Sequence, residues 1–220
     1  MGRTDETNSL EVRWFGTGSP PQALSEWVSG FGDVEPSQRT DVYLSPLDSG
    51  LNLKLRGGGA DAVELKYRLG SGTHHVFSPE VTGTVEQWYK WSFPLEYTPS
   101  LWSADPTGLW VSVEKTRMLS AFETAELRSF DDSISATDAT AHVEVTEVTA
   151  LSNTGWTCGV EATGPPDALE DVLVAVGARV FGESFPVELT ATQSLGYAAW
   201  LRGVSADSTP TSSVLVPSNR

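Results

Sequence analysis

The sequence lacks the features that stabilise small secreted domains or anchor chains in membranes. It has one cysteine, Cys158, which excludes an intrachain disulfide and favours a reducing compartment. No stretch approaches the roughly 18 apolar residues of a membrane-spanning helix. The first nine residues contain no apolar run of the kind that marks a signal peptide. These absences predict a cytoplasmic protein that does not bind membranes.

Positive charge is scarce as well. The 14 basic residues are opposed by 29 acidic ones, which gives a formal net charge of −15. A surface of this sign repels double-stranded nucleic acid, so we expect no such partner. Only four residues are lysines. The positions at which so acidic a chain keeps its cations are therefore informative about what it binds.

What is present is a series of short, strand-like segments. The chain has 220 residues, enough to bury one large core. Gly, Pro, Asp and Ser separate segments in which apolar residues alternate with polar ones. This pattern predicts an α+β fold, mainly antiparallel β, as a barrel or sandwich with few helices. The expected strands are Leu10–Phe15, Thr40–Leu44, Leu51–Arg56, Val63–Leu69, Glu86–Phe93, Leu109–Phe122, His142–Val148 and Trp156–Ala162.

Helices are expected at Pro21–Val28 and Pro165–Phe181, with a last helical turn at Leu195–Leu201. The run of three glycines at 57–59 predicts a hairpin turn between two strands. Residues 203–220 are rich in Ser, Thr and Pro, which is typical of a frayed tail. We therefore predict a single domain over residues 1–202, followed by a polar, flexible C-terminal tail.

Most of the scarce cations lie in the predicted strands, in a regular pattern. Side chains at positions i and i+2 share one face of a strand, so a Lys-x-Arg sequence offers two cations to one face. The alternate residues, such as Leu55 and Tyr67, are apolar and are expected to face a core. The cations are Lys54 and Arg56, Lys66 and Arg68, Lys115 and Arg117, together with Arg13 in the first strand and Lys90.

Two interpretations of this cationic face are open. Like charges on one face cost free energy unless an anion or interleaved acids compensate them, which favours a site for a phosphate-rich polyanion. The alternative is the solvated outer face of a sheet. Acidic strand residues lie nearby, namely Glu11, Glu144 and Glu161. These carboxylates could be salt-bridge spacers, or they could hold Mg²⁺ or Mn²⁺, which take carboxylate oxygens and bridge phosphates.

The order of these motifs resembles the CYTH superfamily, the triphosphate tunnel metalloenzymes. The resemblance implies an eight-stranded, tunnel-like β-barrel with a few flanking helices, in which Lys and Arg hold a triphosphate and Glu residues hold a divalent metal. Members of the superfamily hydrolyse tripolyphosphate, thiamine triphosphate or RNA 5′-triphosphates, or cyclise ATP. The matching segments are Leu10-Glu11-Val12-Arg13, Thr40-Asp41-Val42-Tyr43, Leu53-Lys54-Leu55-Arg56, Leu65-Lys66-Tyr67-Arg68, Glu114-Lys115-Thr116-Arg117, Val160-Glu161-Ala162-Thr163 and Tyr197-Ala198-Ala199-Trp200-Leu201.

The chain departs from the superfamily pattern at its acids. Ser9, Thr146 and Thr163 stand where that pattern has carboxylates, while the cations remain. The resemblance assigns phosphate binding to Arg13, Lys54, Arg56, Lys66, Arg68, Lys115 and Arg117, and a Mg²⁺ or Mn²⁺ ion to Glu11, Glu161 and Glu144. The predicted function is binding, with metal-dependent hydrolysis as its extension, of tripolyphosphate or a nucleoside or organic triphosphate. The alternatives are a non-catalytic polyphosphate- or nucleotide-binding module, and a structural or protein-interaction barrel with solvated charges.

Overall fold

The computed structural model describes residues 5–32, 34–45, 48–59, 61–95, 109–131, 134, 138–182 and 185–208. Its strands form a closed barrel in the order β1-β5-β4-β3-β2-β6-β7-β8, with every neighbouring pair antiparallel. The predicted eight-stranded, mainly antiparallel barrel is therefore confirmed. The strands are β1 (Asp5–Thr17), β2 (Ser37–Leu44), β3 (Leu51–Arg56), β4 (Ala62–Ser78), β5 (Val81–Pro94), β6 (Trp110–Phe122), β7 (Thr140–Ala150) and β8 (Asn153–Thr163).

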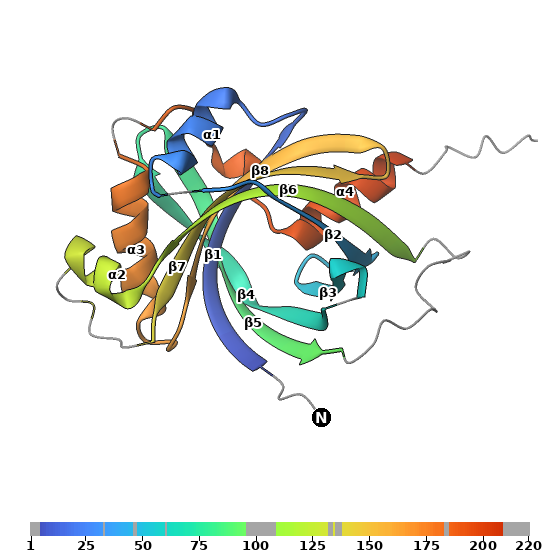
Figure 1. Cartoon of the computed structure of the whole chain (residues 1–220), viewed down its shortest axis with the longest axis horizontal. Coiled ribbons are helices and arrows are strands. Elements are labelled where there is room, and N and C mark those ends of the chain that lie inside the picture. Colours follow the sequence, from blue (N-terminus) through green and yellow to red (C-terminus); the bar gives the residue numbers. More distant parts are fainter. Residues whose placement is uncertain are drawn as a thin grey trace, which may run out of the picture.

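Helices flank the barrel at both ends (Figure 1). In the described part of the chain the α-helices are α1 (Gln22–Ser29), α2 (Thr124–Phe130), α3 (Leu169–Val180) and α4 (Tyr197–Ser208). Figure 1 shows α1, α2 and α3 gathered at one end, while α4 lies at the other. None of the helices that the structure describes is long and apolar enough to cross a membrane.

Alternation along the strands turns charged side chains toward the middle of the lumen and, over much of the barrel, apolar side chains outward. On β1, Val12 and Trp14 point outward and are fully buried against the helices at that end, whereas Glu11 and Arg13 point into the barrel. The cross-strand partners of Val12 and Trp14 on β8 are Val160 and Cys158, which are buried in the same core. This main core therefore lies outside the barrel, which leaves the lumen to polar side chains.

One outer wall is not covered in this way. Along β3 and β4, Leu51, Tyr67 and Leu69 are exposed, with 52% of Tyr67 accessible to solvent. The expectation that these alternate residues face a core is correct for Leu55, which is buried, and wrong for Tyr67. The reason is that α1, α2 and α3 pack mainly on β1, β6, β7 and β8, while α3 reaches β4 at Phe77, beyond the stretch that carries Tyr67.

Strands β4 and β5 are longer than the sequence indicated. The expected strand ended at Leu69, but residues 70–72 form a bulge inside β4, where the pairing shifts between Leu69 and Thr73. Gly70 and Gly72 have φ values of 78° and 81°, in the left-handed region that glycine adopts without strain. A bulge of this kind bends a strand without ending it, so β4 continues around the barrel to Ser78. The three glycines at 57–59 form the predicted turn between β3 and β4.

Helix α4 closes one end of the lumen. Leu201 is fully buried in a small apolar cluster with Phe15 and Tyr43, and Trp200 stacks on Phe15 with ring centroids 5.1 Å apart. Because these contacts anchor its first turns, α4 extends to Ser208, beyond Gly203, where the tail was expected to begin. The rest of the predicted tail, residues 209–220, lies outside the described residues.

Candidate functional site

A polar cavity lies inside the barrel, and all eight strands contribute side chains to it. Its volume is about 100 Å³. The lining charges are six cations and five carboxylates, so this cavity inverts the acidic balance of the whole chain. The lining cations are Arg13, Arg39, Lys54, Lys66, Lys115 and Arg117, and the lining carboxylates are Glu11, Glu64, Glu86, Glu144 and Glu161.

The structure brings most of the predicted cations together here. Five of the seven line the cavity: Arg13, Lys54, Lys66, Lys115 and Arg117. Arg56 and Arg68 lie beside the cavity, and each forms an ion pair with a carboxylate that lines the cavity. Arg56 pairs with Glu64 at 3.1 Å and has 41% of its side chain exposed. Arg68 pairs with Glu86 at 2.5 Å.

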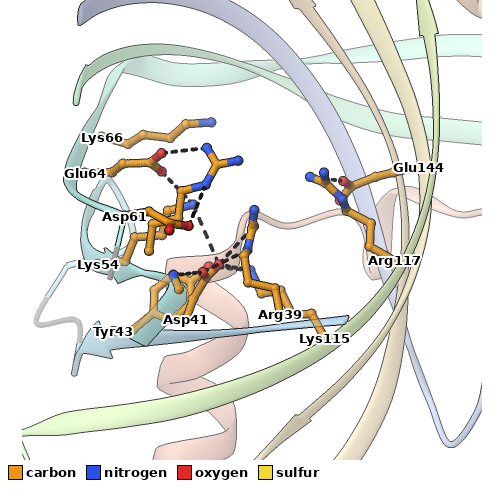
Figure 2. Close-up of polar contacts among 12 residues, drawn as sticks. Arg39, Asp41, Tyr43, Lys54, Asp61, Glu64, Lys66, Lys115, Arg117 and Glu144 are labelled. Carbon is orange, nitrogen blue, oxygen red and sulfur yellow. Dashed lines mark hydrogen bonds and ion pairs between the residues drawn. The ribbon is translucent and has the colours of Figure 1, made fainter. Parts of the chain in front are cut away.

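One group of charges, which we call the cationic cluster, consists of Arg39, Lys54 and Lys115 around Asp41 (Figure 2). The Asp41 carboxylate is fully buried and lies 2.9 Å from Arg39 Nε, 3.0 Å from Lys115 Nζ and 3.9 Å from Lys54 Nζ. Burial opposes its charge, but the three cations hold the pKa of Asp41 well below its usual range. Glu64 lies 2.7 Å from Lys54 and also pairs with Arg56, so even this wider set keeps a surplus of positive charge.

Lys115 is the most deeply buried cation of the cluster. Its ammonium donates to the hydroxyl of Tyr43 at 2.6 Å and lies 4.1 Å from the ring centroid of Tyr197. Burial and the neighbouring Lys54 outweigh Asp41 and lower the pKa of Lys115 to about 7. Burial raises the pKa of Tyr43, so its hydroxyl stays protonated. Lys115 is therefore a group whose charge changes near neutral pH.

A second group, which we call the acidic cluster, consists of Glu11 and Glu161 around Lys66. The Lys66 ammonium donates to Glu11 and, at 3.2 Å, to Glu161. Burial opposes its charge, but the two carboxylates raise the pKa of Lys66 above its usual value. Burial and the proximity of Glu161 raise the pKa of Glu11. Here two acids share one cation, whereas three cations share one acid around Asp41.

Glu144 belongs to neither cluster. It pairs with Arg13 and lies 3.8 Å from Arg117. Gly159 is the cross-strand neighbour of both Arg13 and Glu144, and a Cβ there would come within 3.1 Å of the Arg13 guanidinium carbon. The absence of a side chain at Gly159 therefore makes room for this pair. The two arginines hold the pKa of the buried Glu144 below its usual value.

The three predicted metal ligands all line the cavity, but they do not converge on one point. Glu11 and Glu161 share Lys66, whereas Glu144 is held by arginines. Among the described residues, no group of three or more His, Cys, Asp or Glu side chains is placed to hold a metal ion. Binding of Mg²⁺ or Mn²⁺ therefore stays a prediction.

Several residues of the cavity carry no role in the sequence-based assignment. Arg39, Asp41 and Tyr43 alternate along β2, so the i, i+2, i+4 rule could have placed them on the same face as the Lys-x-Arg pairs. Glu86 on β5 has no comparable signal. Tyr197 reaches the lumen from α4, a contact between the two ends of the chain that strand patterning does not indicate.

In sequence comparisons, no protein-family model and no curated protein matches this chain. In a structural comparison, the chain aligns with a solved structure described as the putative adenylyl cyclase HpAC1 from Hippeastrum, with a dominant triphosphatase activity. The alignment covers 89% of this chain and 96% of that chain, with 11% sequence identity and a TM-score of 0.46.

Proposed function

We propose that the barrel lumen binds a triphosphate or polyphosphate, and that the cationic cluster receives its phosphates. The observation that carries this proposal is the buried Asp41 carboxylate, which is shared by Arg39, Lys54 and Lys115. Buried cations in excess over their acids are costly unless a further anion compensates them. Charge-assisted hydrogen bonds from Lys and Arg to phosphate oxygens are among the strongest polar contacts. The motif order that resembles the CYTH superfamily agrees with this choice of anion.

The burial of these charges disfavours a barrel with merely solvated charges. The side chains of Lys115, Lys54 and Arg39 are 5%, 16% and 22% exposed, although salt bridges at protein surfaces are usually well hydrated. We propose that phosphates displace Glu64 and Glu86 from their cations, because both carboxylates line the cavity and form such pairs.

The proposal favours binding over rapid hydrolysis. Hydrolysis of a triphosphate in such a tunnel is expected to need a divalent ion that neutralises charge on the transferring phosphoryl group. Glu11, Glu161 and Glu144 each already have a cationic partner. We expect phosphate release in the presence of Mg²⁺ or Mn²⁺ to be slow or absent.

Calorimetry with tripolyphosphate tests the proposal. We expect a Kd of about 1 μM or tighter in EDTA, on the order of −8 kcal/mol. Orthophosphate at the same ionic strength serves as the control and should bind more weakly, because it engages fewer of the cations. Absence of saturable tripolyphosphate binding would contradict the proposed function. Fast phosphate release with Mg²⁺ or Mn²⁺ would instead identify the chain as a metal-dependent phosphohydrolase.

A further inference from the structure

The register of β1 and β8 forces two carboxylates together. Glu11 is the direct cross-strand partner of Glu161, and both side chains face the cavity. They are only 14% and 23% exposed. Like charges directly opposite each other on adjacent strands destabilise a sheet. The sheet geometry therefore creates a position that requires a cation.

Lys66 supplies that cation from a strand that is adjacent to neither β1 nor β8. It lies on β4, which is separated from β1 by β5 in the order of the barrel. Its long side chain brings the ammonium between the two carboxylates, where it donates to both. An ammonium has three donors and no acceptor, so these two hydrogen bonds use its capacity well.

The surrounding oxygen atoms do not fit a divalent ion in addition to this ammonium. Mg²⁺ and Ca²⁺ take six or more oxygen ligands at roughly 2.0–2.6 Å. The hydroxyl of Ser9 donates to Glu11 at 2.7 Å, and that of Thr163 shares a hydrogen bond with Thr140 at 2.6 Å. Glu86, the cross-strand neighbour of Glu11 on β5, is likewise engaged, because it pairs with Arg68. A divalent ion would have to displace Lys66.

We infer that Lys66 is the resident cation of the acidic cluster. Its ammonium occupies the place between Glu11 and Glu161 that a divalent ion would need, so that the tunnel binds its phosphates without a metal. The statement about phosphates rests on the proposed function. The statement about Lys66 concerns the carboxylate pair alone and can be tested with a metal ion in the absence of any phosphate.

The test is to remove the ammonium and measure Mn²⁺ binding. In Lys66→Met, the side chain keeps its length and loses its charge, which leaves Glu11 and Glu161 without their cation. We expect this variant to bind Mn²⁺ at least about tenfold more tightly than the native chain, since the ion no longer competes with an ammonium for the two carboxylates. The measurement is calorimetry or electron paramagnetic resonance of free Mn²⁺. Mn²⁺ should also raise the Tm of the variant more than that of the native chain.

Combining Lys66→Met with Glu161→Gln provides the matched control, in which the gained Mn²⁺ affinity should disappear. If Lys66→Met does not fold, Lys66→Gln replaces it, because an amide can still donate to a carboxylate without carrying charge. A folded, uncharged variant that gains no Mn²⁺ affinity would overturn the inference. So would tight Mn²⁺ binding by the native chain that Glu161→Gln abolishes. Tripolyphosphate binding by the native chain in EDTA tests the proposed function separately, so failure of one can be told from failure of the other.

Discussion

The two clusters in the lumen have the same geometry with charges of opposite sign. In the acidic cluster, Glu11 faces Glu161 across β1 and β8. In the cationic cluster, Arg39 faces Lys115 across β2 and β6. Each like-charged pair is bridged by a single residue of opposite charge, Lys66 in the first and Asp41 in the second.

The two bridging residues differ in how firmly they are placed. Asp41 has a short side chain, lies two residues from Arg39 on the same strand, and also accepts a hydrogen bond from the backbone of Gly57 at 3.2 Å. Lys66 reaches its partners on a long side chain from β4. The cationic cluster holds Lys54 as a third cation, whereas the salt bridges of the acidic cluster join two acids to one lysine. The surplus positive charge of the cationic cluster therefore surrounds a firmly placed carboxylate, an arrangement that suits a site for an anion.

Removing Asp41 should have the largest effect. In Asp41→Asn the three cations of the cluster lose their buried counter-charge, and breaking a buried ion pair typically costs about 3–5 kcal/mol. We expect a loss of that order in the free energy of unfolding, measured by urea denaturation. Tripolyphosphate should restore part of the lost stability, because it supplies negative charge to the same cations.

The same substitution at Asp61 is the control for this comparison. Asp61 is 56% exposed and lies 3.9 Å from Arg56, so Asp61→Asn should cost less than about 1 kcal/mol. Equal losses in the two variants would contradict the assignment of Asp41 as the centre of the cationic cluster.

The second prediction concerns Lys54, which contacts both Asp41 and Glu64 and lines the cavity. Lys54→Met removes one charge-assisted contact to phosphate, worth about 1.5–3 kcal/mol. The affinity for tripolyphosphate should therefore fall roughly tenfold to a hundredfold, as calorimetry would show. Arg179→Met on α3 removes an exposed cation outside the cavity and should leave the affinity unchanged. A comparable loss in both variants would indicate binding through overall charge alone.

The third prediction uses the lowered pKa of Lys115, about 7, against an ordinary value of 10.5. Between these values the unfolded chain binds the proton that the folded chain has lost, so this residue makes stability rise with pH in that window. The affinity for phosphates should instead fall as the pH rises, because a bound anion favours the charged form of the Lys115 ammonium. We expect the affinity for tripolyphosphate to fall by up to about tenfold from about pH 6 to about pH 8.

Lys115→Met is the control for the pH profile. The variant should bind more weakly at the lower pH and should lose the part of the pH dependence that belongs to Lys115. Tripolyphosphate itself titrates in this range, so the informative quantity is the difference between the two profiles in the same buffers. Parallel profiles for the native chain and the variant would show that Lys115 does not titrate on binding.

The sequence predicted which face of a strand carries charge better than it predicted the position of that charge along the barrel. Lys54, Lys66 and Lys115 line one cavity, on the charged strand faces that the Lys-x-Arg pairs predicted. Arg56 and Arg68 lie on the same strand faces as Lys54 and Lys66, but both lie beside the cavity. The position of a residue along the axis of a barrel depends on strand register and stagger, which involve residues far apart in the sequence and are not set by local alternation.

The cavity residues outside the Lys-x-Arg pairs were the least predictable part of the site. Glu86 and Tyr197 join the cavity through β5 and α4, by contacts between distant segments. Arg39 was missed for a simpler reason, because the expected strand began at Thr40 whereas β2 begins at Ser37. Strand ends are hard to place when flanking residues are polar, as Ser37 and Gln38 are.

The smallest effect is expected from Glu161→Gln, the counterpart of Asp41→Asn in the acidic cluster. Two opposing changes nearly cancel there. Lys66 loses a partner at 3.2 Å but keeps Glu11, and the repulsion that raises the pKa of Glu11 disappears. The amide oxygen of glutamine can still accept a hydrogen bond from Lys66. We expect the free energy of unfolding to change by less than about 1 kcal/mol, within the range of a single hydrogen bond.

Urea denaturation of Glu161→Gln and Asp41→Asn side by side measures the contrast. Asp41→Asn removes the central acid from a cation-rich group, whereas Glu161→Gln removes one negative charge from an acid-rich group. A loss from Glu161→Gln as large as that from Asp41→Asn would mean that Lys66 needs both carboxylates, and that the two clusters do not differ in the way their charge ratios indicate.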